Sequence, residues 1–374
     1  MISRRAAIKK RLSWYWFLFA VVGYGLIFFA FLWLRSWWMP PYPRRWFLVA
    51  ALTYGTILWV LGRNLEKNHR PGEDVLLSTL GWGNTISLLR GVLMAAFSGF
   101  LFLPWPGGKA AWLPGILYTA AALPDFLDGA VARLTDHVTE LGAKLDVSID
   151  SLGVLAVTAI AVQYDQVPPW YLLVGLARYL FLAGIWIRER LGKPVHELRY
   201  SVRRRGFAGL SMGFFFVILY PVFGPPSTVL AATVFGLYIL GGFLWDWLLV
   251  SGVVSHDDGR RFDGLKAFAI RWLPLGLRVA LFPLAWLHLA PQRWTLTPLL
   301  LAEIIVSLAV LVGLAGRVTA IMALIFLGLQ QATASLDWAG MTLILVYANL
   351  LFLGTGAFSL WPVEDDLIYK RVGD

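Results

Sequence analysis

Four aspartates stand at helical spacing in a chain that carries few charges. They form two pairs, Asp125 with Asp128 and Asp146 with Asp150, within the stretch from Leu123 to Gly153. Residues three or four positions apart share one face of a helix, so each pair presents two carboxylates on one side. The link between the helices is short. We therefore expect the helices to lie antiparallel, with the two pairs facing each other.

Four carboxylates that converge in this way repel one another. Divalent cations relieve such repulsion, and a ligand set made only of oxygen atoms favours Mg²⁺ or Mn²⁺ over Zn²⁺. Two such cations would neutralise the cluster and attract a diphosphate. The alternative is a salt-bridged helix pair that binds no ligand. A fifth aspartate, Asp136, lies off the pattern in the link, and we expect solvent around it.

Small and basic residues accompany the first pair. Gly129 and Ala132 lie on the adjacent turns and leave the backbone open to a flat ligand. Arg133 lies about 80° around the helix from Asp125, on the flank away from Asp128. From there its guanidinium could bind a phosphate.

The elements that hold these residues are membrane helices. Of the 374 residues, 59% are hydrophobic and only 14% are charged, whereas soluble domains carry about 25% charged residues. The absence of cysteine excludes disulfides, thiolate catalysis and cysteine-ligated metals. The net charge of +10 comes from basic loops between apolar runs, which favours contact with anionic lipid over nucleic acid.

Apolar runs predict an all-α polytopic membrane protein with about twelve transmembrane helices. The predicted spans are residues 13–34, 46–62, 84–105, 112–134, 145–163, 169–188, 207–223, 227–250, 272–290, 296–315, 317–337 and 340–358. Basic residues concentrate in the loops of one side. This bias predicts that both termini and the aspartates lie on the cytoplasmic side of a bacterial or archaeal cell membrane.

The aspartate string resembles, position for position, the signature of the CDP-alcohol phosphotransferase family. It reads Asp-x-x-Asp-Gly-x-x-Ala-Arg, then eight residues, then Gly-x-x-x-Asp-x-x-x-Asp. The stretch "GNTISLLRG" is similar to the pattern that opens the family's first helix, through Asn84, Thr85, Ser87 and Arg90. The resemblance covers about 75–255. It implies a six-helix membrane enzyme that uses two divalent metals to cleave a CDP-alcohol and release CMP.

The resemblance also implies a role for each matching residue. Asp125, Asp128 and Asp146 would be metal ligands, and Asp150 would be the general base and also touch the second metal. The nucleotide would lie against Asn84, Ser87, Arg90, Gly129, Ala132, Arg133, Thr139 and Gly142. The alternative for Arg90 is a side chain that reaches to the membrane interface.

The acceptor's phosphate, if it has one, has three candidate ligands in the loop before residue 207. These are Arg203, Arg204 and Arg205, whose alternative role is positive-inside topology and contact with lipid headgroups. The nearby "GLSMG" (209–213) is a small-x-x-x-small pattern, which predicts a helix-packing face and could serve a homodimer.

The last hundred residues lack the aspartate pattern. Here "LLLAEIIVSLAVLVGLAGRVTAIMAL" and "LFLGTGAFSL" resemble the DoxX-like four-helix membrane family, which supplies a fold rather than a function. The chain then divides into a two-helix N-terminal anchor region (1–74), a CDP-alcohol phosphotransferase domain (75–255) and a DoxX-like membrane domain (266–374).

The predicted function is metal-dependent transfer of a phosphatidyl or related group from a CDP-activated lipid, such as CDP-diacylglycerol, to a hydroxyl acceptor in phospholipid biosynthesis. A soluble CDP-activated donor with a lipid acceptor is a variant of this hypothesis. The alternative from another class is a divalent-cation transporter whose intramembrane carboxylates bind the ion in passage. A third possibility is a scaffold in which the last four helices bind partners.

Overall fold

The structure is a computed structural model that describes residues 2–198, 202–254, 263–289, 298–332 and 335–361. The side chains of some helical positions lie outside this description, among them Asp125, Asp128 and the three arginines 203–205. The described residues divide into two compact units, residues 1–164 and 165–374. The predicted division into three regions stays a prediction.

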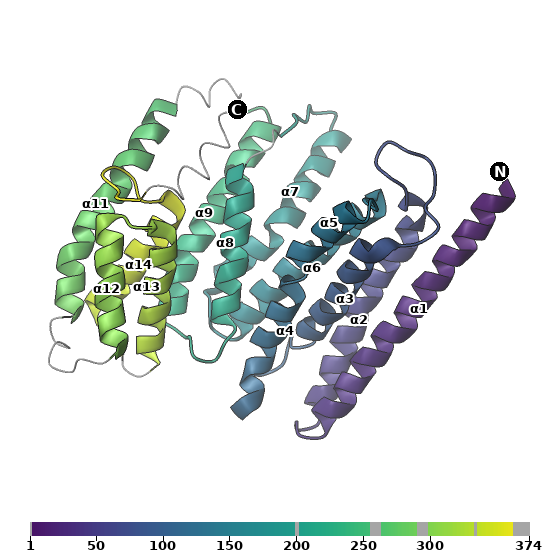
Figure 1. Ribbon diagram of the computed structural model, residues 1–374, viewed down its shortest axis with the longest axis horizontal. Helices are drawn as coiled ribbons and strands as arrows, with labels where there is room; N and C mark the ends of the chain where they lie inside the picture. Colours follow the sequence, from purple (N-terminus) through teal and green to yellow (C-terminus); the bar gives the residue numbers. More distant parts are fainter. Residues whose placement is uncertain (1, 199–201, 255–262, 290–297, 333–334, 362–374) are drawn as a thin grey trace. The chain divides into compact units, whose positions relative to one another are not determined.

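The described part of the chain is all-α, as the apolar runs predict, and holds thirteen α-helices (Figure 1). The first unit contains α1 (Ile2–Arg35), α2 (Tyr42–Asn64), α3 (Gly81–Ser98), α4 (Leu113–Ala122), α5 (Asp125–Leu134) and α6 (Glu140–Gln163). The second contains α7 (Leu172–Arg190), α8 (Val202–Ile218), α9 (Ser227–Val250), α11 (Asp263–Leu289), α12 (Pro298–Val312), α13 (Gly316–Gln331) and α14 (Trp338–Leu353).

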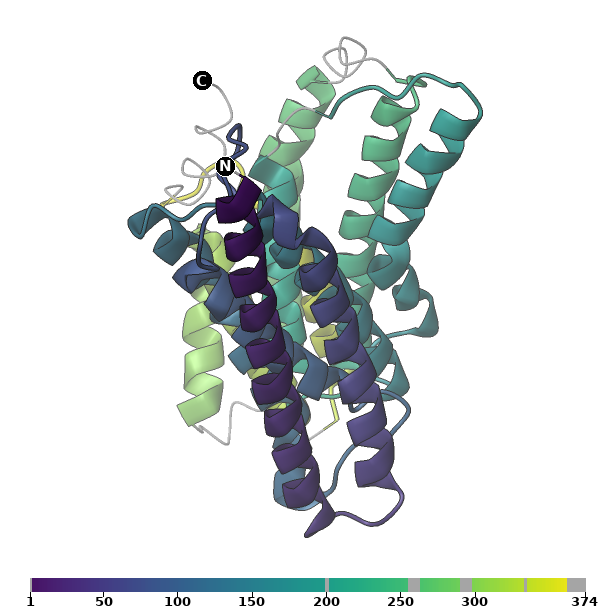
Figure 2. The same cartoon turned by 90° about the vertical axis from the view of Figure 1, so that its right-hand side faces the viewer.

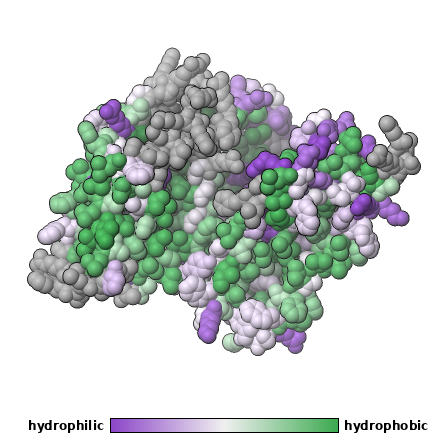
Figure 3. Space-filling view, viewed as in Figure 1, coloured by the Kyte–Doolittle hydropathy of each residue, from purple (hydrophilic) through white to green (hydrophobic). Residues whose placement is uncertain are grey.

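Six of these helices are long and apolar enough to cross a membrane, and four shorter helices are also apolar. The six are α1, α2, α6, α7, α9 and α11, and the shorter apolar helices are α8, α12, α13 and α14. Large apolar side chains such as Phe29, Trp59 and Trp286 are exposed, and hydrophobic residues cover broad areas of the face in Figure 3. Such a surface needs lipid around it. The chain is therefore a polytopic membrane protein.

The predicted span 112–134 is wrong as a single helix. The structure has two helices there, α4 and α5, which separate at Leu123 and Pro124. Proline has no N–H to donate, and its ring collides with the carbonyl four residues earlier in a continuous helix. The predicted span 84–105 is also too long, because α3 ends at Ser98, before Pro104 and Pro106.

In the first unit, α1 and α2 lie side by side in both views (Figures 1 and 2). Two polar side chains of these helices find backbone partners across the pair. Trp16 Nε1 donates to the Leu58 carbonyl at 2.8 Å, and the Tyr54 hydroxyl donates to the Phe19 carbonyl at 2.8 Å. Helix α2 then packs on α3, and α3 packs on α4, α5 and α6. Helix α3 is therefore the centre of this unit.

In the second unit, α14 contacts α9, α11 and α13, and α12 contacts α11 and α13. Buried Arg278 of α11 donates to the carbonyls of Leu311, Thr355, Ala357 and Phe358, which ties the turn after α14 to α11 and α12. These bonds satisfy a charge that would be costly if it were buried alone.

A buried polar group joins α11 to α12, α13 and the start of α14. His288 Nδ1 lies 2.6 Å from Asp337 Oδ1, and its Nε2 lies 2.9 Å from Gln330 Oε1 and 3.5 Å from Glu303 Oε1. Glu303 lies in the first of the two stretches that resemble the DoxX-like family. The DoxX-like fold stays a prediction.

Candidate active site

Helix α3 places three buried polar residues on one face. Asn84, Ser87 and Arg90 are three residues apart, which puts them on successive turns of the same side. All three are buried, and Arg90 is only 2% exposed. A buried arginine requires charged or polar partners.

The partners of Arg90 include two aspartates of α6. Arg90 Nη1 donates to Asp146 Oδ1 at 3.0 Å, and Arg90 Nη2 donates to Asp150 Oδ1. The two aspartates lie one turn apart, so one planar guanidinium reaches both. Their side chains remain 43% and 34% exposed. Arg90 thus points toward α6, and the two carboxylates that it contacts stay partly exposed.

A second contact joins α3 to the beginning of α6. Thr139 is the N-cap of α6, and its hydroxyl accepts from the Gly142 N–H at 3.0 Å and from Asn84 Nδ2 at 3.2 Å. A Cβ atom at Gly142 would lie only 2.5 Å from Asn84 Oδ1. Gly142 therefore lacks a side chain because Asn84 of the neighbouring helix takes that space.

The link between α5 and α6 also packs against the start of α3. The His137 ring lies over Gly81, whose φ is +78°, and a Cβ atom there would lie 2.2 Å from His137 Cδ2. His137 Nε2 lies 3.1 Å from the Thr79 carbonyl. Asp136, also in the link, forms an ion pair with Arg70 and is otherwise 86% exposed. The link thereby fixes where α3 and α6 begin relative to each other.

Helix α5 carries the other two predicted metal ligands in its first turn. Asp128 lies six positions before the end of α5, and Asp146 lies six positions after the start of α6. At 1.5 Å per residue, both are about 9 Å along their helices from the shared link. Helix α3 packs on both helices. The side chains of Asp125 and Asp128 lie outside the described residues, so their contribution to a common pocket stays a prediction.

The remaining predicted nucleotide ligands lie on α5. Ala132 is half-buried and Arg133 is exposed. A Cβ atom at Gly129 would lie 3.4 Å from Arg133 Nη1, so the arginine side chain folds back one turn toward Gly129. The structure therefore places Arg133 beside Gly129, the glycine that we expect to leave the backbone open to a flat ligand. Their binding of a nucleotide remains a prediction.

The predicted acceptor ligands Arg203, Arg204 and Arg205 belong to the first turn of α8. Their side chains lie outside the described residues. Their role stays a prediction.

The described donors suit a divalent cation. Asp146 and Asp150 bring carboxylate oxygens to one place, and their exposed fractions leave access from one side. Hard cations such as Mg²⁺ and Mn²⁺ prefer such oxygens. Among the described side chains, no three His, Cys, Asp or Glu residues form a metal-binding group. The part of Asp125 and Asp128 in a metal site stays a prediction.

The sequence motif does not predict two features of this site. The first is that Arg90, predicted to contact the nucleotide, binds the aspartates of α6. The second is that Gly142 serves the contact with Asn84. The charge of Arg90 within an apolar helix is a signal for the first, because such a residue needs a carboxylate nearby.

Comparison with known proteins gives the family of this part of the chain. Residues 81–255 match the family model of CDP-alcohol phosphatidyltransferase. This range contains α3, α5 and α6 with all the residues described above. Residues 81–255 thus belong to the CDP-alcohol phosphatidyltransferase family of enzymes, as the aspartate string predicts.

Several individual proteins are similar to parts of this range. The CDP-diacylglycerol–glycerol-3-phosphate 3-phosphatidyltransferases of Cereibacter sphaeroides and Bacillus subtilis are 34% and 33% identical over 121 and 112 residues. These matches cover 32% and 27% of this chain, and 53% and 58% of the two relatives. The chain thus spans a little over half the length of these relatives.

The match with a third relative covers a larger share of that relative's length. It is a protein of Mycobacterium tuberculosis described as a candidate cardiolipin synthase, 29% identical over 171 residues, which are 45% of this chain and 78% of the relative. No solved structure matches the chain.

Proposed function

We propose that the protein transfers a phosphatidyl group from CDP-diacylglycerol to a hydroxyl acceptor and releases CMP, in phospholipid biosynthesis. One observation supports this most directly. Arg90, buried in α3, binds both Asp146 and Asp150 of α6, which fixes two carboxylates in one register while leaving them open on one side. The family match over the same helices supplies the reaction class.

The proposed reaction is a single displacement at phosphorus. The acceptor oxygen attacks the phosphorus attached to diacylglycerol, a new phosphorus–oxygen bond forms, and the bond to the CMP oxygen breaks. The proton of the acceptor hydroxyl passes to an Asp150 carboxylate oxygen. A general base must lie within hydrogen-bond reach of the proton that it removes, and the contact with Arg90 supports this role because it holds the Asp150 carboxylate in position.

Other residues of α3, α5 and α6, and of the link before α6, would position the donor. Asn84 and Thr139 hold the first turn of α3 against the N-terminus of α6. Gly129 and Ala132 would leave room for the nucleotide, and Arg133 would bind phosphate oxygens. Ser87 lies on the same face as Arg90 and would complete the nucleotide wall together with Gly142.

Divalent cations fit this donor set. Asp125, Asp128, Asp146 and Asp150 would hold two Mg²⁺ or Mn²⁺ ions, which supply charge stabilisation for the diphosphate when bound. The two described carboxylates carry the oxygen donors that such ions prefer. Removal of cations with EDTA should abolish CMP release, and either metal should restore it.

The proposal also covers the acceptor, the orientation of the protein in the membrane and the last four helices. The name of the Cereibacter sphaeroides relative points to glycerol 3-phosphate as the acceptor, and that of the Mycobacterium tuberculosis relative points to cardiolipin as the product. The arginines at the start of α8 would bind an acceptor phosphate. By the distribution of basic loops, the aspartates and both termini would face the cytoplasm. The last four helices would form a DoxX-like membrane domain.

The test is direct synthesis. Purified protein is incubated with Mg²⁺ or Mn²⁺, CDP-diacylglycerol and a panel of acceptors that includes glycerol 3-phosphate, inositol phosphate and phosphatidylglycerol, and the lipid product is identified by mass spectrometry. We expect one acceptor to give a product in step with CMP. A soluble donor such as CDP-choline with diacylglycerol forms the parallel arm. Product only in that arm would replace the proposed donor.

The transporter hypothesis predicts a different result. A divalent-cation carrier would move Mn²⁺ into proteoliposomes and release no CMP from any CDP-alcohol. The small and basic residues that accompany the aspartates argue against it, because Gly129, Ala132, Arg133 and Gly142 have no role in an ion path.

A further inference from the structure

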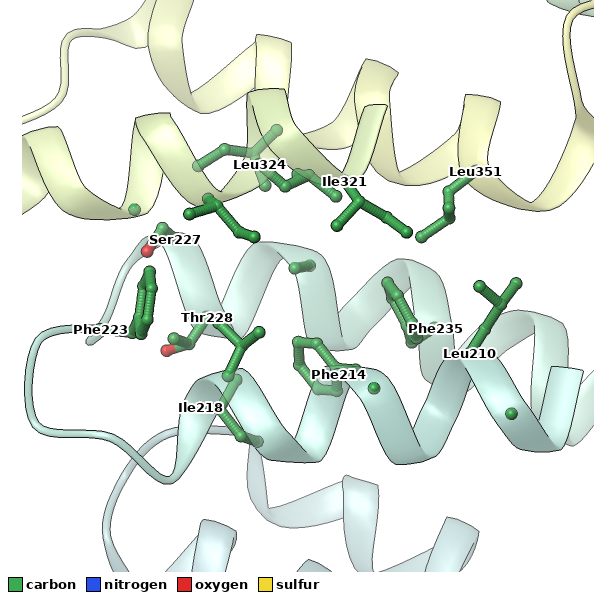
Figure 4. Close-up of a pocket in the computed structure, with 17 residues that line it drawn as sticks. Leu210, Phe214, Ile218, Phe223, Ser227, Thr228, Phe235, Ile321, Leu324 and Leu351 are labelled. Carbon is green, nitrogen blue, oxygen red and sulfur yellow. The ribbon is translucent and has the colours of Figure 1, made fainter. Parts of the chain in front are cut away.

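A cavity of about 240 Å³ lies within the second unit, between the pair α8 and α9 and the pair α13 and α14 (Figure 4). Its walls are almost wholly apolar. They include Phe214 and Ile218 of α8, Phe235 of α9, Ile321 and Leu324 of α13, and Leu351 of α14. Four helices thus surround a space that their own side chains do not fill.

The cavity reaches from the core of this unit to its surface. Ile218 and Phe235 are 1% and 3% exposed, whereas Ile321 is 38% exposed and Gly209 is also exposed. The surrounding helices α8, α13 and α14 are apolar. Because these helices are apolar, we expect the opening to face the hydrocarbon of a bilayer, and an apolar cavity does not hold water stably. Hydrocarbon is therefore the occupant that the walls favour.

Two glycines of α8 leave the space empty. Gly209 and Gly213 lie one turn apart and both line the cavity. A Cβ atom at either would meet no described atom within 4 Å. At Gly236 of α9, by contrast, a Cβ atom would lie 2.6 Å from the Trp170 ring. The small-x-x-x-small pattern therefore borders a cavity in this unit, and its predicted role in a homodimer stays a prediction.

One end of the cavity carries a hydroxyl that has no partner. Thr228 lies at the start of α9 beside Phe223 (Figure 4) and is 5% exposed. Its Oγ1 makes no hydrogen bond within the described part of the structure. The neighbouring polar groups are satisfied: Ser227 Oγ donates to the Gly224 carbonyl at 2.8 Å, and the Ser227 N–H donates to Gln331 Oε1 at 3.0 Å.

An unpaired buried hydroxyl is unfavourable, and a ligand that supplies an acceptor removes the penalty. A ligand that fits this cavity therefore has one hydrogen-bond acceptor at the Thr228 end and a hydrocarbon chain along the remaining walls. An esterified fatty acyl chain has both features, because its carbonyl lies at one end of a long apolar tail. A free cation, a sugar or a nucleotide has no counterpart in these walls.

We propose that this cavity binds one acyl chain of a bilayer phospholipid, with the ester carbonyl accepting a hydrogen bond from Thr228 Oγ1. The chain enters past Ile321 and lies along α8 over Gly213 and Gly209. The site is separate from the aspartate chemistry, and it stands whether or not the protein releases CMP.

The test uses photolabelling in lipid nanodiscs. The full-length protein is reconstituted in unlabelled phosphatidylcholine with a small fraction of phosphatidylcholine that carries a diazirine on one acyl chain. After irradiation, the labelled peptides are mapped by mass spectrometry. We expect labels on the segments 209–218 and 321–328, which line the cavity.

Filling the cavity should remove these labels. Gly213→Leu places a side chain in the empty space, and we expect labelling of 209–218 to fall at least fivefold. Gly241→Leu is the matched control, because Gly241 of α9 also has no described atom near a Cβ but does not line the cavity. Intrinsic tryptophan fluorescence during heating checks that each variant is folded, and Gly213→Ala serves if the leucine variant does not fold.

The hydroxyl is tested separately. Thr228→Val keeps the shape and removes the donor, so labelling should fall about threefold to tenfold, the effect of one lost hydrogen bond, while Thr228→Ser retains it. Equal labelling of wild type, Gly213→Leu and Gly241→Leu would mean nonspecific contact with surrounding lipid and would overturn the proposal. Labelling with a diazirine CDP-diacylglycerol but not with phosphatidylcholine would also overturn it, since the occupant would then be the substrate.

Discussion

Replacing Arg90 with methionine should separate the two carboxylates that the site depends on. Methionine is also long and unbranched, so it keeps much of the packing of the arginine stem within α3. It removes both N–H donors that reach Asp146 and Asp150. The two aspartates then have no shared guanidinium to hold them in register one turn apart.

The size of the effect follows from the two bonds. A hydrogen bond to a charged group contributes about 1.5 to 3 kcal/mol. The aspartate side chains are 43% and 34% exposed, so water partly replaces the lost donors and the lower figure applies. Two such bonds give about 3 kcal/mol. If this energy serves to position Asp150, the rate falls by about a hundredfold, since about 1.4 kcal/mol corresponds to a factor of ten.

The assay measures CMP release from CDP-diacylglycerol by purified variants in detergent, together with thermal unfolding followed by tryptophan fluorescence. Arg90→Lys keeps the charge but offers a single compact ammonium, so it should recover part of the loss. Arg63→Met is the control, because Arg63 at the end of α2 is exposed and lies over the Trp59 ring at 5.4 Å.

Two results would refute this reasoning. Arg90→Met with CMP release within twofold of the wild type would show that the contact with the aspartates does not position the catalytic base. Equal losses in Arg90→Met and Arg63→Met would show that the assay reports only general damage to the membrane domain.

Three further predictions concern neighbouring residues. Asp150→Asn should lower CMP release by at least about a hundredfold, the usual effect of a general base, while Mn²⁺ binding measured by electron paramagnetic resonance largely persists. Loss of all Mn²⁺ binding would assign Asp150 a ligand role alone. The control is Asp74→Asn, at an exposed loop position. Gly142→Ala should raise the KM for the CDP-lipid several-fold, because the new Cβ would lie 2.5 Å from Asn84 Oδ1 and must push the Asn84 side chain away. Gly25→Ala should leave the KM unchanged, because a Cβ atom there meets no atom within 4 Å. Equal KM values in the two variants would contradict this prediction. Thr139→Ala should destabilise the protein by about 1 kcal/mol through loss of the α6 N-cap, seen as a lower Tm, and Thr139→Ser should restore the wild-type Tm; a serine variant as unstable as alanine would disprove the capping role.

The sequence predicts the helices well because long apolar runs need a helix to satisfy their backbone in lipid. It fails where a single residue interrupts such a run. Pro124 lies inside an apolar stretch of ordinary composition, and the structure divides that stretch into α4 and α5. The division matters for the site, because it makes Asp125 the first residue of its own helix.

The site is predictable in part for a related reason. Spacing alone places Asn84, Ser87 and Arg90 on one face of α3, and Asp146 with Asp150 on one face of α6. Spacing within a helix does not say which neighbouring helix each residue meets. The bonds from Arg90 to the aspartates and the approach of Asn84 to Gly142 depend on how α3 packs against α6.

The cavity shows the same limit of prediction from sequence, here for a space that is left empty. The glycines at 209 and 213 predict a packing face, but the sequence shows only that side chains are missing there. The surrounding helices decide between the two, and here they leave the space open.

The central claim is that the carboxylates held by Arg90 cleave a CDP-activated lipid. A single time course that counts CMP and phosphatidyl product together, for wild type and Asp150→Asn with Mg²⁺ present, tests it most directly. The account predicts equal molar amounts of both products from the wild type and neither from the folded variant. Folded wild-type protein that makes no CMP from any CDP-alcohol, yet carries Mn²⁺ into proteoliposomes, would contradict it.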